Sequence, residues 1–106
     1  MRVRYVNVAL GELRRAIRYY ATAAPGLGDQ FADAIDATLL RIRRNPRAGT
    51  PVVGGRRRLN VDRFPYSIIV EVWKQEQAVV VIAVAHQKRK PGYWRARKRP
   101  TNEQIR

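Results

Sequence analysis

YSIIVEVWKQEQAVVVIAVAH, residues 66–86, contains two apolar segments joined by a short polar one. In the first segment, residues 66–74, Tyr66, Ile68 and Val70 alternate with other side chains at a period of two, which predicts a strand. Residues 79–86 form the second strand, and because it is apolar on both faces we expect it to lie centrally in a sheet. The polar residues 75–77 allow only a tight connection between the two strands.

Upstream of this stretch, residues 7–23 and 27–44 predict two amphipathic helices, because their apolar residues recur at intervals of three and four. The expected apolar stripes are Leu10, Leu13, Ile17 and Tyr20 in the first helix, and Phe31, Ile35, Leu39 and Ile42 in the second. Glu12 falls on the face assigned to solvent. The short Pro25-Gly26 loop predicts that the helices pack as an antiparallel hairpin.

The remaining segments complete a single domain over residues 1–106. Residues 2–6 and 57–62 predict two further strands, whereas residues 47–55, with three glycines and a proline, predict an irregular connection. From about residue 88 the chain is expected to be a basic C-terminal tail. The resulting order is β-α-α-β-β-β, an α+β fold with the helical hairpin packed on one face of a small, mainly antiparallel sheet.

The composition is strongly basic, with 22 Lys and Arg against eight Asp and Glu and a net charge of +14. Residues 41–63 and residues 86–106 each contain eight cations and one acid, so a basic face is expected. Such a face attracts nucleic acid or an acidic protein partner.

Several classes of protein do not fit the sequence. The chain has no cysteine, one histidine and scattered acids, so no metal site, disulfide framework or small-molecule cofactor is expected. No signal peptide or membrane-length apolar run is present, which predicts a cytoplasmic protein without a membrane partner.

Four stretches of the sequence resemble the RelE/ParE superfamily of toxins from type II toxin–antitoxin systems, also described as plasmid stabilisation proteins. They are ALGELRRAIRYY at 9–20, PGLG at 25–28 followed by Phe31, Arg58-Leu59 with RFPYSI at 63–68, and AVAHQKRKPGYW at 83–94. The resemblance implies growth inhibition and an acidic antitoxin that neutralises the toxin.

Two targets are implied by the same resemblance. ParE-type members poison DNA gyrase, whereas RelE-type members cut mRNA on the ribosome. The RFPY and AVAH segments are closer to the ParE-type branch, which favours a gyrase poison over an mRNA endonuclease. A third interpretation is an inactive basic module that binds nucleic acid.

Metal-independent RNA cleavage needs a group that moves protons and a cation that stabilises the phosphorane. His86, Arg63 and Tyr93 are the catalytic candidates if the protein is a nuclease. Each also has a structural interpretation: His86 can bond the chain as it leaves the sheet, Arg63 can pair with Asp62 or Glu71, and Tyr93 can pack back on the core.

Residues for binding a nucleic acid or another target are expected in the two basic segments. They are Arg56, Arg57, Arg58, Lys88, Arg89, Lys90 and Trp94. A strand would divide the arginine run between two faces, and the run could equally receive the antitoxin's acids. Trp94 either stacks on a base or covers an open part of the core.

Overall fold

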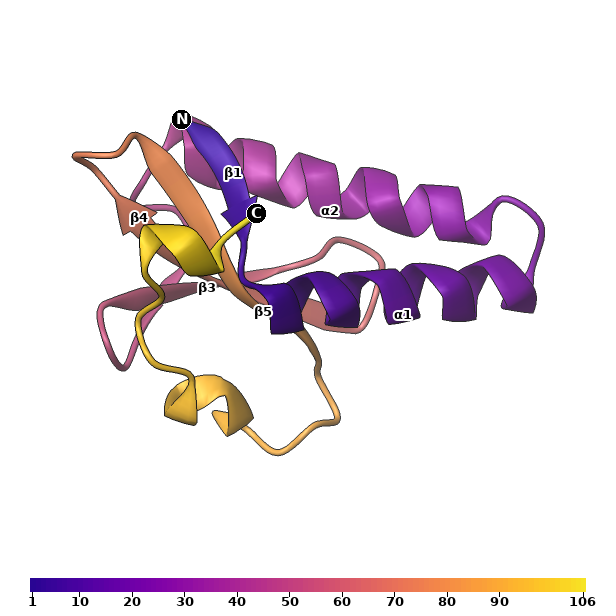
Figure 1. The fold of residues 1–106 in the computed structure, drawn as a ribbon. Helices are drawn as coiled ribbons and strands as arrows, with labels where there is room; N and C mark the ends of the chain where they lie inside the picture. Colours follow the sequence, from indigo (N-terminus) through magenta and orange to yellow (C-terminus); the bar gives the residue numbers. More distant parts are fainter.

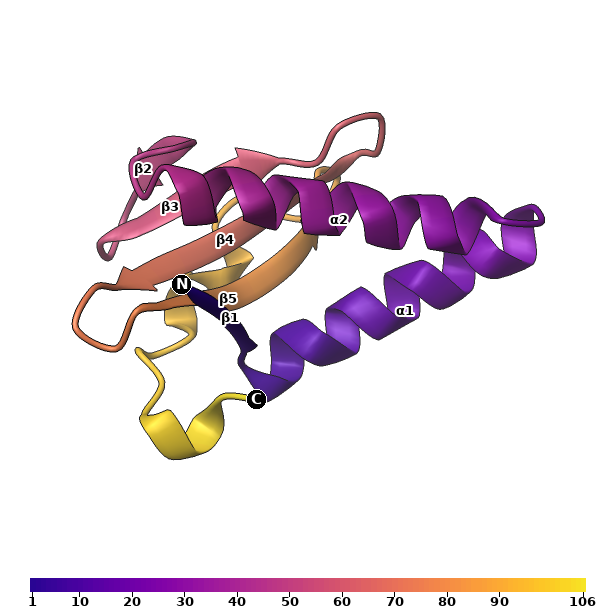
Figure 2. The same ribbon diagram turned by 90° about the horizontal axis from the view of Figure 1, so that it is seen from above.

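The computed structural model describes all of residues 1–106. Its elements are β1 (Arg2–Tyr5), α1 (Asn7–Ala23), α2 (Leu27–Arg44), β2 (Thr50–Val52), β3 (Arg56–Asn60), β4 (Tyr66–Trp73), β5 (Ala78–His86) and the 3-10 turns η1 (Tyr93–Ala96) and η2 (Asn102–Gln104). Figures 1 and 2 show α1 and α2 side by side, with the turn between them projecting away from the sheet. Neither helix has both the length and the apolar character needed to cross a membrane.

The sheet has the order β1-β5-β4-β3-β2. Only the pair β1–β5 is parallel, and β5 is internal as predicted from its apolar sequence. The predicted α+β class and the hairpin on one face are confirmed, but the connection at 47–55 contains one more strand than expected. This strand, β2, was missed because it has three residues and includes Pro51, which a sheet accepts at an edge.

The helices cover one face of the sheet and form the helix-side core. Its buried side chains include Phe31, Ile35, Leu39 and Ile42 from α2, and Ile68 and Val70 from β4. The predicted stripe of α2 is therefore confirmed. In α1 the fully buried positions are Ala9, Glu12 and Ala16, while the larger predicted residues are only partly buried.

The other face of the sheet is covered by the C-terminal segment, residues 87–106, which is drawn in yellow-orange and yellow in Figures 1 and 2. This packing forms the second-face core, whose buried members are Ile69, Trp73, Ala78, Val80, Ile82, Ala83, Trp94 and Ile105. The segment ends beside β1, where Arg106 and Tyr5 exchange two backbone hydrogen bonds of 2.8 and 3.2 Å. This covering explains why β5 is apolar on both faces.

The strand β5 contains a local irregularity, and part of its edge has no neighbouring strand. Ile69 pairs with Ala83 and Val70 pairs with Val81, so Ile82 is an extra residue in the strand. Beyond Val81, the edge of β5 has no neighbouring strand, because β1 ends at Tyr5. Backbone groups along this free edge therefore need other hydrogen-bond partners.

Candidate target-binding site

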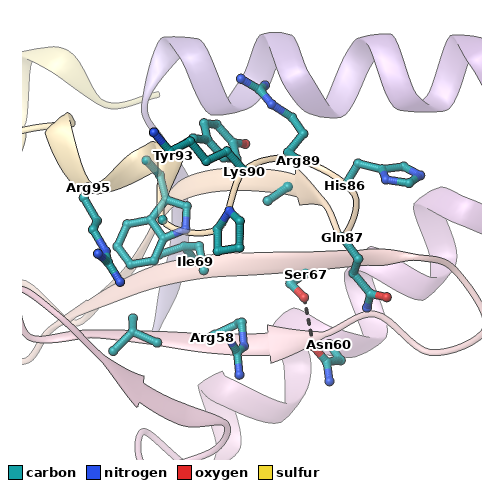
Figure 3. A pocket seen from close by; sticks show the side chains of 15 residues that line it. Arg58, Asn60, Ser67, Ile69, His86, Gln87, Arg89, Lys90, Tyr93 and Arg95 are labelled. Atoms are coloured by element: carbon teal, nitrogen blue, oxygen red, sulfur yellow. Dashed lines mark hydrogen bonds between the residues drawn. The ribbon is translucent and has the colours of Figure 1, made fainter.

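A groove of about 430 Å³ opens on the face of the sheet that the helices leave free. Its base is formed by β3, β4 and the end of β5, and its wall by residue 87 and residues 89–95 (Figure 3). Four exposed cations line it: Arg58, Arg89, Lys90 and Arg95. No Asp or Glu is among the lining residues, so the groove, here called the cationic groove, concentrates positive potential.

The arginine run 56–58 is divided between the two faces of β3, as predicted. Arg57 is fixed on one face by hydrogen bonds of 2.7 and 2.6 Å to the carbonyl oxygens of Ala48 and Arg47. Arg58 lies on the opposite face, exposed in the cationic groove. Arg58 is therefore the member of the run best placed to meet a target.

Arg56 shares a face with Arg58 but is only 6% exposed, which corrects its expected role as a binding residue. Its Nε donates to the Glu71 carboxylate at 2.9 Å, and its other nitrogens donate to the carbonyl oxygens of Trp94 and Arg97. Glu71 also accepts the indole N–H of Trp73 at 2.9 Å. Arg56 therefore attaches the C-terminal segment to the sheet.

Trp94 is likewise 6% exposed and belongs to the second-face core, so it has no free ring face on which a base could stack. Arg56 lies over its ring, 5.8 Å from the centroid. In this position Trp94 covers the core, which is one of the two interpretations of this residue.

Glu12, which the helical pattern assigned to solvent, is a buried carboxylate at the centre of a hydrogen-bond network. It accepts the hydroxyl of Tyr93 at 2.7 Å and both terminal nitrogens of Arg97 at 2.9 Å. It also accepts the Val84 N–H at 3.0 Å, from the free edge of β5. Ala9, Glu12 and Ala16 lie on one face of α1 at helical spacing, and the two small alanines are a signal that could have located Glu12 on the buried face.

The network fixes the ionisation of its members. Burial raises the pKa of Glu12, but the bonds from Arg97, Tyr93 and the Val84 N–H outweigh this effect and hold it below its ordinary value. Burial, and then the bond to Glu12, raise the pKa of Tyr93 to about 12. Burial lowers the pKa of Arg97, yet the bond to Glu12 outweighs it and the net shift is upward. Tyr93 therefore keeps its proton and donates a hydrogen bond to a charged carboxylate.

Arg89 connects this network to the cationic groove. Its guanidinium carbon lies 3.7 Å from the centroid of the Tyr93 ring, and one of its nitrogens lies 3.6 Å from Glu12. The side chain is still 53% exposed, so it retains donors for a ligand. Lys90 is exposed in the groove, whereas Lys88 is exposed outside it.

His86 lies at the rim of the groove, but its ring points away from Tyr93 and Arg95 (Figure 3). The ring packs edge-on against Tyr66, with 5.0 Å between centroids, and Nδ1 accepts the Lys88 N–H at 3.0 Å. This bond requires an unprotonated Nδ1 and places the proton of the neutral ring on Nε2.

Arg63 lies in the connection between β3 and β4 with a positive φ of 67°. It lines a different groove, which it shares with Ala37, Arg41 and Arg44 of α2. The three catalytic candidates are thus not brought together around one cavity. No group of three or more His, Cys, Asp or Glu residues could hold a metal ion.

Comparisons with known proteins agree with this architecture. A family model described as the ParE toxin of the type II toxin–antitoxin system parDE matches residues 3–91. The crystal structure of the isolated E. coli RelE toxin is similar, with a TM-score of 0.58 and 17% sequence identity. That similarity covers 90% of this chain and 93% of the RelE chain, and it concerns the fold alone. No curated protein matches significantly.

Proposed function

This chain belongs to the ParE toxin family of type II toxin–antitoxin systems, and from that premise we propose that it inhibits growth by binding and poisoning DNA gyrase. The family match covers most of the chain and includes both the helical hairpin and the strands. The predicted membership of the RelE/ParE superfamily is confirmed.

The chemistry of the cationic groove supports a binding function over proton-transfer catalysis. The Tyr93 hydroxyl donates a hydrogen bond to Glu12, the His86 ring at the rim of the groove points away from Tyr93, and Arg63 lines another cavity. General acid–base chemistry requires such groups within hydrogen-bond reach of one reacting phosphate. This separation is the observation that favours a gyrase poison.

The partner that neutralises the toxin is proposed to be an acidic antitoxin. The two buried acids, Glu12 and Glu71, already have arginine partners within the chain. Most of the net charge of +14 therefore remains on the surface, available to an acidic segment that folds as it binds.

One observation favours the mRNA endonuclease as a second candidate. The cationic groove is large enough for a nucleotide and carries four exposed cations, which is the electrostatic requirement for holding a phosphodiester. In this function Arg58 and Arg89 would stabilise the phosphate, and a conformational change would have to bring His86 or Tyr93 to it.

Inducible expression in bacteria separates these functions in one culture. The gyrase function predicts relaxed plasmid DNA and a DNA-damage response while transcripts stay intact. Transcript cleavage with normal supercoiling would establish the endonuclease instead. Normal growth in the presence of folded protein would favour the third interpretation, an inactive module that binds nucleic acid.

A matched pair of variants identifies the surface that acts. Arg58→Gln removes an exposed cation from the cationic groove, and Arg14→Gln removes one from the exposed face of α1. We expect growth inhibition to be weakened by the first substitution and retained with the second.

A further inference from the structure

The geometry points to Glu12 as the residue that positions Arg89 and Tyr93 at the cationic groove. Glu12 does not line the groove, so its role is indirect. The inference rests on the proposed function in one respect, namely that the groove is the surface that meets the target. The contacts that carry it join α1 to residues 84–97, which lie 72 to 85 positions later in the chain.

The two oxygens of the Glu12 carboxylate bind different parts of the chain. Oε1 accepts from the Val84 N–H and from Arg97, and so ties α1 to the free edge of β5 and to the C-terminal segment. Oε2 accepts from Tyr93 and Arg97 and faces Arg89. A single buried anion therefore holds the wall of the groove against the first helix.

Arg89 and Tyr93 both depend on the negative charge of Glu12 for their orientation. Arg89 is held by its stacking on Tyr93 and by the attraction of Glu12, and Tyr93 is oriented by its bond to Glu12. Without the carboxylate charge, both side chains lose the group that fixes their direction. The groove would keep its cations but lose their arrangement, which is the property that binding depends on.

Other contacts hold the C-terminal segment on the sheet, so we expect loss of the Glu12 charge to have a local effect. Trp94 and Ile105 remain packed in the second-face core, and Arg56 still holds two backbone carbonyls of the segment. Arg97 also keeps its 2.8 Å bond to the Ile82 carbonyl oxygen. Loss of the charge should therefore loosen residues 88–97 without opening the sheet.

Glu12→Gln tests the proposal, because glutamine keeps the size of the side chain and an oxygen that can accept the Val84 N–H. Native-state hydrogen exchange can follow the amides of Tyr93, Arg95 and Arg97, which bond to carbonyl oxygens within the same segment. We expect their protection to fall about tenfold, the equivalent of one charge-assisted hydrogen bond. Protection in β5 should stay at its original level.

Glu76→Gln is the matched control, since it makes the same chemical change at an exposed site in the β4–β5 turn. It should leave the exchange pattern and growth inhibition unchanged. Tyr93→Phe provides a second variant, which removes one donor to Glu12 but keeps the ring under Arg89. We expect the same exchange pattern with a smaller amplitude.

The readouts separate positioning from stability. Selective loss of protection in residues 93–97, together with weaker growth inhibition by Glu12→Gln, supports the proposal. Equal loss throughout β5, or no change at residues 93–97, would overturn it. If the wild-type protein does not inhibit growth at all, the proposed function fails, and the exchange pattern still decides the role of Glu12.

Discussion

At the scale of single residues, two buried carboxylates organise the C-terminal segment. Glu12 and Glu71 are 7% and 6% exposed, and each is paired with an arginine. A buried ion pair is mainly costly to break on one side only, because the remaining charge is then uncompensated. The packing of the C-terminal segment on the second face of the sheet therefore depends on the arginine partners of these two acids.

Arg56→Met tests the pair with Glu71. The substitution leaves Glu71 with the exposed Arg99, whose Nε is 3.7 Å away, as its only charged partner, so we expect the free energy of unfolding to fall by about 3 kcal/mol. The double variant Arg56→Met/Glu71→Gln removes both charges and keeps an acceptor for Trp73. It should lose less stability than Arg56→Met alone in urea unfolding, and an equal or greater loss would show that the pair is not coupled.

Tyr93 predicts a dependence of stability on alkaline pH. Burial and the bond to Glu12 raise its pKa to about 12, and burial and then Asp36 raise that of Tyr5 to about 12. An unfolded tyrosine loses its proton near pH 10, so the folded state is favoured by these groups below about pH 10. Their contribution should disappear as the pH rises to about 12.

Urea unfolding across this pH range provides the measurement. Tyr93→Phe should flatten the decline relative to the wild type, since the ionisation of Tyr93 is removed. An identical decline in both proteins would mean that Tyr93 keeps an ordinary pKa.

The sequence predicted the positions of single side chains less well than it predicted the helices and strands. Glu12 was expected in solvent because it lies off the apolar stripe of Leu10, Leu13, Ile17 and Tyr20, together with Arg14, Arg15 and Arg18. Its partners are 72 to 85 residues away in the chain. The alanines at positions 9 and 16 mark the buried face of α1, but no local pattern reveals these long-range partners. The burial of Arg56 was unpredictable for the same reason.

At the scale of elements, periodicity predicted most of the fold. The two helices, the strands β4 and β5 and their arrangement follow from repeats of 3.6 and 2 residues. The apolar sequence of β5 on both faces required a cover on each side, but the irregular composition of residues 87–106 did not reveal that this segment supplies one. The three-residue strand β2 is too short for a period to appear.

The contact between α1 and α2 depends on Gly28. A Cβ added there would lie 2.9 Å from the Cβ of Ala21 and 2.9 Å from the carbonyl oxygen of Ile17. Gly28→Ala should therefore separate the helices and lower the free energy of unfolding by about 1–3 kcal/mol, despite the better helix propensity of alanine.

Gly11→Ala is the control for that substitution. A Cβ at Gly11 meets only the mobile end of Arg15 at 3.3 Å, so the change should be neutral or stabilise α1 by up to about 1 kcal/mol. Thermal unfolding of both variants gives the comparison. Equal effects at the two positions would contradict the close helix packing at Gly28.

At the scale of the whole molecule, the net charge of +14 opposes folding and favours an anionic partner. Raising the ionic strength from about 0.01 M to about 0.15 M shortens the Debye length from about 30 Å to about 8 Å. We expect the urea midpoint of the isolated protein to rise over this range, because repulsion among surface cations is screened. A falling midpoint would indicate that attractive surface pairs dominate.

The proposed action of this protein on DNA gyrase can be measured directly. The most direct measurement adds the purified protein to purified gyrase, ATP and relaxed plasmid, and follows supercoiling on an agarose gel. If the protein poisons gyrase, supercoiling should be inhibited as the protein is titrated in, and cleaved DNA should accumulate. The Arg58→Gln variant should need a higher concentration for the same inhibition. Undiminished supercoiling at every concentration, with mRNA cut in a ribosome assay by the same preparation, would contradict the proposed action on gyrase.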